Sequence, residues 1–241
     1  MSLNQSKTKT ILFSTKRLSS VHSLDPYPLK VHIDVDSLKR ETSVKLLGVF
    51  FDQHLTWQNH ITHIISTSYG KLSILKKLEH FAPFQIRKQL AQIYIMTKID
   101  YMDYIYSPLT QYQIKQLQRL QLVTCSFVYG KYANYQDILN LKWLPIIERR
   151  KFNLLKTIFK AVYNENWPNT CRLEIKRQNR ILRNIDIPFF QFSTFNDTFQ
   201  YQAQTHFNSL PIEVKRLTKY NEFCTAIKLL CFKEAEQRLL I

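Results

Sequence analysis

The spacing of hydrophobic and polar residues changes near residue 53, and this change divides the chain into two predicted parts. Val44–Phe51 is an apolar-rich run that contains Gly48, a pattern typical of a strand that is buried on both faces and lies close to another backbone. From Trp57 onward, apolar residues recur at helical spacing, and Thr56 is the expected N-cap. We therefore predict β structure before this point and almost continuous α structure after it.

Two segments further upstream show the alternation of a strand. Residues 9–15 alternate weakly, and Val31–Leu38 alternates valine and isoleucine with polar residues. A loop rich in serine and proline separates them, so residues 9–53 are predicted to form a small three-stranded antiparallel unit. This unit is thin for a domain. We expect either that the natural domain extends before Met1 or that helices of this chain cover the sheet.

Downstream, apolar residues at helical spacing predict a series of amphipathic helices. One begins at Pro83, with Ile86 and Ile93 on its inner face and with Arg87 and Lys88 pointing away. The next helix is expected to end at a glycine C-cap, Gly130.

A long helix is predicted to follow Pro145, with Phe152 and Leu155 among the residues that face inward. Its outer face is predicted to be strongly basic and comprises Arg149, Arg150, Lys151, Lys156 and Lys160. The basic stretch from Trp167 to about Thr198 lacks periodicity, so we predict a long loop that is either functional or a linker.

The predicted fold class is mainly α, a helical bundle with a small N-terminal antiparallel β unit. Two helices, Phe199–Asn208 and Asn221–Leu240, are expected to complete the chain. The predicted divisions are a β unit over residues 1–55, a helical bundle over 56–165, a basic loop or linker over 166–198 and C-terminal helices over 199–241.

Charge points to an anionic partner. Lys and Arg total 34 and Asp and Glu total 18 among 241 residues, which gives a formal net charge of +16. Such an excess repels itself unless an anion is bound, so nucleic acid is the first expected partner and an acidic membrane surface the second. No apolar run approaches the roughly 18 residues of a membrane span, and the N-terminus lacks a signal-peptide core. We expect a soluble intracellular protein, in the nucleus or cytoplasm, with no membrane partner.

Tyr101–Tyr104 is the segment most similar to a polymerase metal site, because polymerases that copy RNA hold two metal ions on an aromatic-x-Asp-Asp turn. Here Asp103 is followed by Tyr104 instead of a second Asp, and the context is helical. We therefore reject it as a catalytic site. We expect a packed helix segment whose acids, Asp100 and Asp103, are solvated.

Other groupings of metal-binding residues are weak. His54, His60 and His63 cluster at the strand–helix junction, with Asp52 as the nearby carboxylate, and local hydrogen bonding is the favoured interpretation. The four cysteines are scattered, without a Cys-x-x-Cys pair, and are expected to be free thiols. No cofactor is predicted, and the three glycines include no phosphate-binding loop.

Basic helix faces and the abundance of Tyr and Phe favour binding to nucleic-acid phosphates, with occasional stacking on bases. For any single Lys or Arg, the favoured interpretation is that it merely lies on the solvated side of an amphipathic helix. The net charge of the whole chain nevertheless favours nucleic-acid binding. The candidate phosphate-binding residues are Arg87, Lys88, Lys115, Arg119, Arg149, Arg150, Lys156, Lys160, Arg177 and Arg180. The candidate structural residues of the junction are Gly48, Trp57 and His60. Gly48 is expected to allow close approach of another segment, and Trp57 to pack the helix start against the small sheet.

Several short motifs stand in the order of one known family. They are Lys9–Phe13, Leu46–Val49 with Trp57 and His60, Asp103–Tyr104, Leu117–Gln121, Trp143–Ile146 with Arg149–Arg150, and Phe207–Pro211. In this order, the chain resembles the end of the palm, the thumb and the C-terminal region of reverse transcriptases from non-LTR (LINE, Jockey-like) retrotransposons. The resemblance covers nearly the whole chain.

The resemblance implies the function of a thumb, which holds the RNA template and its RNA/DNA duplex by the backbone and not by sequence. It makes residues 1–55 a palm-like remnant and 56–165 a thumb-like bundle. The family's metal carboxylates would lie before Met1, so this chain is expected to be inactive alone, with Mg²⁺ needed only in a complete parent polymerase. The missing catalytic part is then a further expected partner. The alternative is a domesticated or structural helical protein that binds an acidic protein.

Overall fold

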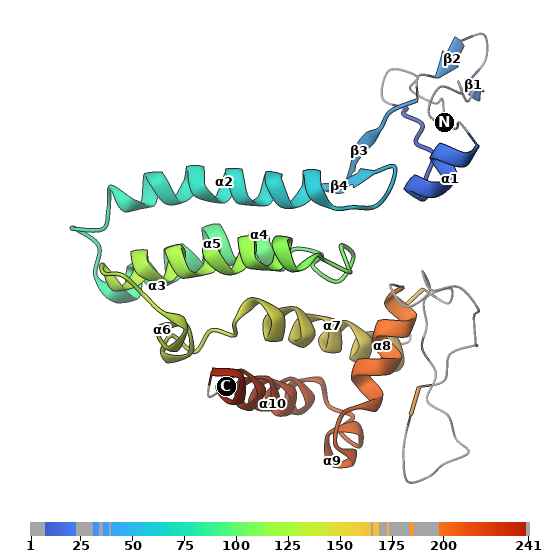
Figure 1. Ribbon diagram of the computed structural model, residues 1–241. Coiled ribbons are helices and arrows are strands. Elements are labelled where there is room, and N and C mark those ends of the chain that lie inside the picture. The colour runs from blue at the N-terminus through green and yellow to red at the C-terminus, as the bar shows by residue number, and fades with distance from the viewer. Residues whose placement is uncertain are drawn as a thin grey trace. The chain divides into compact units, whose positions relative to one another are not determined.

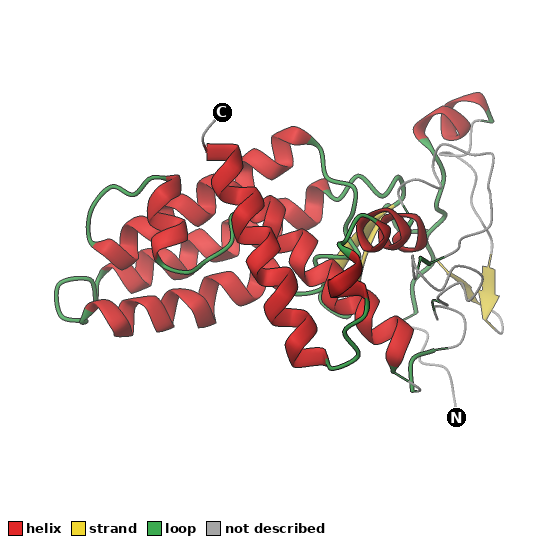
Figure 2. Ribbon diagram, turned by 90° about the horizontal axis from the view of Figure 1, so that it is seen from below, coloured by secondary structure: helices red, strands yellow, loops and turns green. Residues whose placement is uncertain are grey.

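The computed structural model describes residues 8–22, 31–33, 36–38, 40–164, 166–168, 173, 184–185 and 198–239. Helices make up most of the described chain, and short antiparallel strands lie near the N-terminus (Figure 2), which confirms the predicted fold class. The chain divides into two compact units, residues 1–66 and 67–241, and this division lies within a helix, 11 residues after the boundary predicted at residue 55.

In the first unit, the strands form two hairpins. β1 (Val31–Ile33) pairs antiparallel with β2 (Asp36–Leu38), and β3 (Ser43–Leu46) pairs antiparallel with β4 (Val49–Asp52). The predicted three-stranded unit is wrong for the described residues. Of residues 9–15, only Thr10 joins a bridge, which is parallel, to Arg40.

A helix replaces the continuation of the first predicted strand. Thr15 accepts a hydrogen bond from the backbone N–H of Leu18 and so caps α1 (Lys16–Val21). Threonine is a favoured N-cap because its side-chain oxygen satisfies an N–H that has no intrahelical partner. The weak alternation before it was too short to specify a strand.

Gly48 has a different role from the one predicted. Leu47 and Gly48 form the turn between β3 and β4, and both have positive φ angles, +48° and +88°. A two-residue hairpin turn requires this conformation, which glycine adopts without steric cost. The apolar run is therefore a hairpin, not a single strand buried on both faces, and Leu46 and Leu47 are 59% and 73% exposed.

Asp52 organises the start of the first long helix, α2 (Gln58–Lys76). Its carboxylate accepts hydrogen bonds from the backbone N–H groups of His54, Thr56 and Trp57 at 3.0–3.1 Å. The predicted N-cap, Thr56, lies one residue too early, because the first helical hydrogen bond is accepted by the carbonyl of Trp57. The Trp57 ring is 5% exposed and packs edge-on against Phe51 of β4 at 5.5 Å, which confirms the predicted contact between helix start and sheet.

The second unit contains the remainder of the helices (Figure 1), which short loops connect up to Tyr163. These helices are α3 (Phe84–Ala91), the π-helical η2 (Gln92–Met96), α4 (Thr97–Asp100), α5 (Gln111–Tyr129), α6 (Tyr135–Asn140), α7 (Ile146–Tyr163), α8 (Phe199–Asn208), α9 (Ile212–Lys215) and α10 (Tyr220–Leu239). A capping box of Thr110 and Gln113 begins α5, and Gly130, at φ +69°, ends it as predicted.

α7, α8 and α10 enclose a hydrophobic core. α10 packs along α7, and α8 packs against α7 (Figure 1). Phe159 of α7 lies at the centre, with its ring 4.7 Å from that of Phe223 and 4.5 Å from that of Tyr163. Fully buried side chains of this size each stabilise the fold by roughly 1.5–3 kcal/mol. The core therefore holds α7 firmly enough to position its polar side chains.

The inner face of α3 differs from the prediction. Ile86 and Ile93 are 45% and 59% exposed, whereas Ala91 and Ile95 are buried. The π-helical turn η2 accounts for the change at Ile93 and Ile95, because a π-helix adds a residue per turn and moves the side chains within and after it around the axis. Ile86 precedes η2, and its exposure shows that the apolar spacing alone misplaced the inner face of α3. Arg87, predicted to point away, instead donates from Nη1 to the carbonyl of Phe127 at 3.4 Å.

No helix in the described ranges is both long and apolar enough to cross a membrane. The predicted basic segment 166–198 lies mostly outside the described residues, and so do its candidate binding residues Arg177 and Arg180.

Candidate nucleic-acid interface

The first turn of α7 directs its arginines into the protein. Arg149 donates through Nε and Nη2 to the two carboxylate oxygens of Asp100, at the end of α4. Asn153, one turn later, donates to Oδ1 of Asp100 at 3.3 Å and to Oδ2 of Asp103 at 2.7 Å. This is a bidentate ion pair with a bridging amide, and the Arg149 side chain is only 12% exposed.

Two neighbouring cations also have partners inside the fold. Arg150 donates from Nη2 to the carbonyl of Tyr106 at 2.8 Å, and its guanidinium lies 4.8 Å from the centre of the Tyr106 ring. Lys151 donates to the carboxylate of Glu234 on α10 at 2.6 Å. The prediction of an outward basic face on α7 is therefore wrong for its first turns. Helical spacing alone could not show that acids from distant segments lie opposite these residues.

The cations that do gather lie around a cavity of about 380 Å³, here named the basic cavity. Four lysines from four segments line it, and among the described residues none of them is in an ion pair. They are Lys88 of α3, Lys142 after α6, Lys156 of α7 and Lys228 of α10. The remaining charges, Arg149 and Asp100, neutralise each other, so the cavity is strongly positive.

An unsatisfied hydrogen-bond donor lies in the same lining. The indole of Trp143 is 4% exposed, and its Nε1–H has no hydrogen-bond partner among the described residues. A buried donor without a partner is costly, so an acceptor that enters the cavity would restore a missing interaction. Positive charge and a spare N–H together suit an anion with oxygen acceptors, such as a phosphate.

Outside the basic cavity, two further lysines lie close together, Lys71 of α2 and Lys98 of α4. The pKa of Lys98 is lowered by burial and by the neighbouring positive charge of Lys71. Lys71 also lies 5.3 Å from the centre of the Tyr94 ring. Two ammonium groups this close repel each other, so an anion between them would relieve the repulsion.

The other candidate binding residues are dispersed. Lys115 and Arg119 are exposed on α5, and Lys160 is exposed near the end of α7, with its Nζ 5.5 Å from the centre of the Tyr220 ring. None of them lines the basic cavity. Of the predicted set, the structure therefore brings together Lys88, Arg149 and Lys156.

Asp103 is buried, which corrects the expectation that both acids of this segment are solvated. It lies in the loop after α4 and is 2% exposed. Burial raises the pKa of Asp103 to about 7, and the hydrogen bond from Asn153 and the charge of Arg150 only partly oppose this rise. Asp103 is thus about half ionised near neutral pH.

The junction histidines are hydrogen-bonded within the first unit, although the partner of His54 Nδ1 lies 40 positions earlier in the chain and is not local as favoured from the sequence. His60 is buried and its Nδ1 accepts from the backbone N–H of Phe50 at 3.5 Å, while Nδ1 of His54 bonds the carbonyl of Ser14 at 2.8 Å. Burial, followed by the proximity of His63, lowers the pKa of His60 to about 4. Within the described ranges, no group of three His, Cys, Asp or Glu could hold a metal ion.

The thiols of Cys125, Cys224 and Cys231 are free. The two buried ones, Cys125 and Cys231, have pKa values that burial raises to about 12, so neither is poised as a nucleophile.

Comparison with known proteins yields no match. No protein-family model matches the chain, and neither a curated protein nor a solved structure is significantly similar to it.

Sequence reasoning missed several residues of the interface. Lys142 and Lys228 lie in a turn and on α10, where no regular basic face was visible, and Trp143 was noted only as part of a motif. Nothing in the sequence distinguishes Lys142 from other lysines, and its unusual backbone conformation, with a φ of +60°, is visible only in the structure. A list of lysines could not show which of them converge, because the convergence depends on how α3, α7 and α10 pack.

Proposed function

We propose that the basic cavity binds the phosphate backbone of nucleic acid, and that this chain is the thumb-like, C-terminal part of a non-LTR retrotransposon reverse transcriptase. The observation that supports the binding function is the convergence of four lysines on one cavity. Within the described ranges these lysines have no ionic partner, and the cavity is also lined by Trp143, whose buried indole N–H has no acceptor there. The chain would position RNA or an RNA/DNA duplex by its backbone and would not itself polymerise.

The motif residues support the link between the resemblance and the cavity. Trp143, Leu144 and Arg149, which belong to one of the matching motifs, line the basic cavity. Pro145 is the N-cap residue of α7, so it helps to set where this helix starts. Residues of this motif therefore form part of the wall of the cavity that is proposed to bind phosphates.

The test is the salt dependence of binding to an RNA/DNA hybrid duplex, measured by fluorescence anisotropy. Each phosphate contact contributes about 0.9 to the slope of log affinity against log salt. The triple variant Lys88→Ala/Lys156→Ala/Lys228→Ala should lower the slope by about 2 to 3 and weaken binding severalfold or more.

A matched control removes the same charge elsewhere. Lys76, Lys77 and Lys233 are exposed and do not line the basic cavity. Their triple replacement by alanine should leave most of the slope intact. An equal loss in the two triple variants would show that binding follows total charge and not the cavity.

Primer extension tests the second half of the proposal. Two-metal phosphoryl transfer needs a pair of carboxylates around the metal ions. With magnesium or manganese, the chain should incorporate no nucleotide. Incorporation that disappears in Asp103→Ala would reverse the rejection of this segment as a catalytic site.

A second candidate function is binding to an acidic protein partner. Exposed apolar side chains favour this function. Ile74, Phe81 and Ile93 are 64%, 85% and 59% exposed, and they lie in the same part of the sequence as Lys76, Lys77 and Lys88. Exposed apolar side chains mark protein contact surfaces when they are contiguous. Failure to bind a hybrid duplex even at low salt would favour this function over the first.

A further inference from the structure

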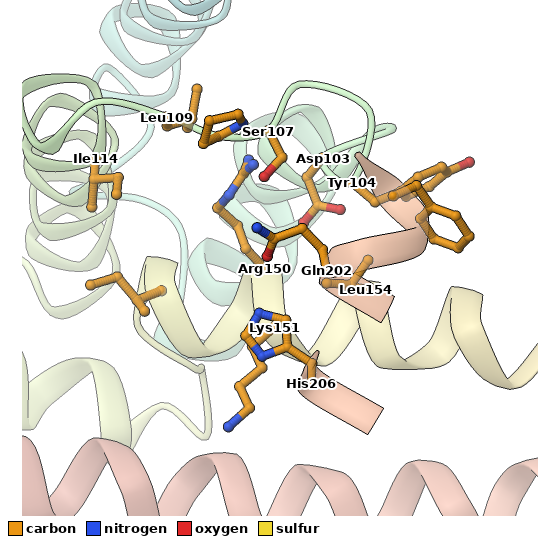
Figure 3. Close-up of a pocket in the computed structure, with 13 residues that line it drawn as sticks. Asp103, Tyr104, Ser107, Leu109, Ile114, Arg150, Lys151, Leu154, Gln202 and His206 are labelled. Atoms are coloured by element: carbon orange, nitrogen blue, oxygen red, sulfur yellow. The ribbon is translucent and has the colours of Figure 1, made fainter. Parts of the chain in front are cut away.

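A second cavity, of about 280 Å³, lies beside the first turns of α7 and is distinct from the basic cavity (Figure 3). We name it the mixed cavity, because polar and apolar side chains share its wall. Its polar lining residues are Asp103, Tyr104, Ser107, Arg150, Lys151, Gln202 and His206. Its apolar lining residues come from the loop before α5 and from α5, α7 and α8, and they include Leu109, Ile114, Leu154 and Phe199.

Two polar atoms of this lining are left unsatisfied. Oδ1 of Asp103 and Nη1 of Arg150 are buried, and neither has a hydrogen-bond partner in the part of the chain that the structure describes. Figure 3 shows both side chains directed toward the same region as Ser107 and Gln202. Buried polar groups are normally hydrogen-bonded, so an acceptor and a donor that both lack partners in one cavity indicate a ligand with the complementary pair.

The other atoms of these two side chains are bonded to the protein. Oδ2 of Asp103 accepts from Asn153, and Nη2 of Arg150 donates to the carbonyl of Tyr106. These bonds anchor the carboxylate and the guanidinium, and so restrict the movement of the remaining oxygen and nitrogen. Such a preorganised acceptor and donor can recognise a ligand without having to move first.

The surroundings restrict the ligand to a small, partly apolar ring. The volume of the mixed cavity, about 280 Å³, lies just below the roughly 300–1,000 Å³ typical of ligand sites, so it suits a single ring system. The rings of Tyr104 and Phe199, which both line it, meet edge-on at 6.4 Å between centroids. Aromatic and aliphatic walls around a polar pair match a heterocycle with a hydrogen-bonding edge.

Among the nucleobases, guanine and uracil both place a ring N–H next to a carbonyl oxygen, and guanine adds a second donor, its amino group, and a second acceptor, N7. The O6 and N7 of guanine are the acceptors that arginine most commonly contacts, and its ring N–H lies next to O6 on the same edge. That N–H, or the neighbouring amino group, can donate to a carboxylate. Adenine has an amino group at the position of O6, which would face the Arg150 donor with another donor.

We propose that the mixed cavity binds a guanine base, with Oδ1 of Asp103 accepting from the base N–H and Nη1 of Arg150 donating to its oxygen. The choice of a nucleobase rests on the proposed nucleic-acid function. The base reaches the site either as a free nucleoside or as a base splayed out of a single strand held nearby.

The experiment measures binding of guanosine and adenosine to the full chain by isothermal titration calorimetry. Guanosine should bind saturably and adenosine should bind about tenfold more weakly or worse, because an analogue that leaves buried groups unpaired is rejected. Asp103→Asn, which keeps the shape of the side chain, should lower the guanosine affinity by about tenfold or more. Leu109→Phe, a loop substitution that fills the cavity, should abolish binding.

Glu236→Gln is the matched control, because Glu236 is exposed on α10 and does not line the mixed cavity. It removes the same negative charge as Asp103→Asn and should leave guanosine binding unchanged. Circular dichroism and thermal melting establish that each variant is folded. Equal binding of guanosine and adenosine, no guanosine binding at all, or unchanged binding in both folded cavity variants would overturn the proposal.

A second arm distinguishes the two sources of the base. An oligoadenylate with one central guanosine is compared with the plain oligoadenylate in the wild-type chain and in Asp103→Asn. A gain from the guanosine that disappears in the variant identifies a base within a strand, whereas a response to guanosine alone identifies the free nucleoside. Guanosine has no phosphate, so it can bind the mixed cavity even if a duplex does not bind the basic cavity. Likewise, a duplex can bind the basic cavity even if guanosine does not bind the mixed cavity.

Discussion

Arg149 and Arg150 are neighbours in the sequence, yet they line two different cavities beside the same helix, α7. Successive residues of an α-helix are about 100° apart around its axis, so these two side chains project in different directions. Arg149 lines the basic cavity and is neutralised by the bidentate contact with Asp100. Arg150 lines the mixed cavity together with Asp103, and its Nη1 has no hydrogen-bond partner among the residues that the structure describes.

The difference between the cavities lies in which charges have been neutralised. In the basic cavity the arginine has a structural partner, and the available charges belong to lysines on four segments. In the mixed cavity, burial opposes the ionisation of Asp103, so its carboxylate costs stability. One of its oxygens, Oδ1, also has no hydrogen-bond partner in the described ranges. Charge that is already paired stabilises the fold, and charge without a partner is what a ligand can use.

The largest expected effect is on stability, from Arg149→Ala. This change leaves Asp100 without its ion-pair partner at a site where both side chains are mostly buried. Breaking such a pair typically costs about 3–5 kcal/mol, and the partial exposure of Asp100 places the loss near about 3 kcal/mol. Urea denaturation measures the free energy of unfolding.

The double variant Arg149→Ala/Asp100→Ala serves as the control for this prediction. Removing both partners leaves no uncompensated charge, so much of the lost stability should return. A cost below about 0.5 kcal/mol for the single variant would mean that the pair is effectively a surface pair.

A smaller effect of opposite sign is expected for Asp103→Asn. The folded-state pKa of about 7 lies above the ordinary value of 3.8, so the unfolded chain releases the Asp103 proton first as pH rises. The wild type therefore loses stability between about pH 4 and pH 7, and the uncharged Asn variant does not. Asp103→Asn should be more stable than wild type by about 2 kcal/mol at pH 8, because each pKa unit is worth about 1.4 kcal/mol and the amide offsets part of the gain.

Urea denaturation at pH 5 and pH 8 checks this difference. The gain should be clearly smaller at pH 5. A gain of the same size at both pH values would show that ionisation of Asp103 is not its source. A real gain would also indicate that the acid is retained for a purpose other than stability, since functional sites often cost stability.

The smallest expected effect on stability comes from Lys156→Ala. This lysine contacts the face of Phe152 at 5.1 Å but is in no ion pair among the described residues, so unfolding should change by no more than about 0.5 kcal/mol. Its effect should appear instead in duplex binding, where the salt slope should fall by about 0.9. A stability loss comparable to that of Arg149→Ala would remove the distinction between the paired and the available cations of the two cavities.

The amino-acid sequence by itself determined the helical character of this protein and several of its helix ends. Gly130 ends α5 and a proline precedes each of α3, α7 and α9, because these residues act through local backbone geometry. Local patterns also placed Trp57 against the small sheet.

Tertiary structure decided the site. Asp100 and Asp103 contact residues of α7 that lie about fifty positions later in the chain, and Glu234 reaches Lys151 from 83 positions away. No local periodicity encodes such contacts, so the sequence could not distinguish the arginines that are neutralised from the lysines that are available. It could not show the burial of Asp103 either, because burial depends on the packing of a loop against α7. The charge of a residue is local information, but whether that charge has a partner depends on which distant segments the hydrophobic core brings beside it.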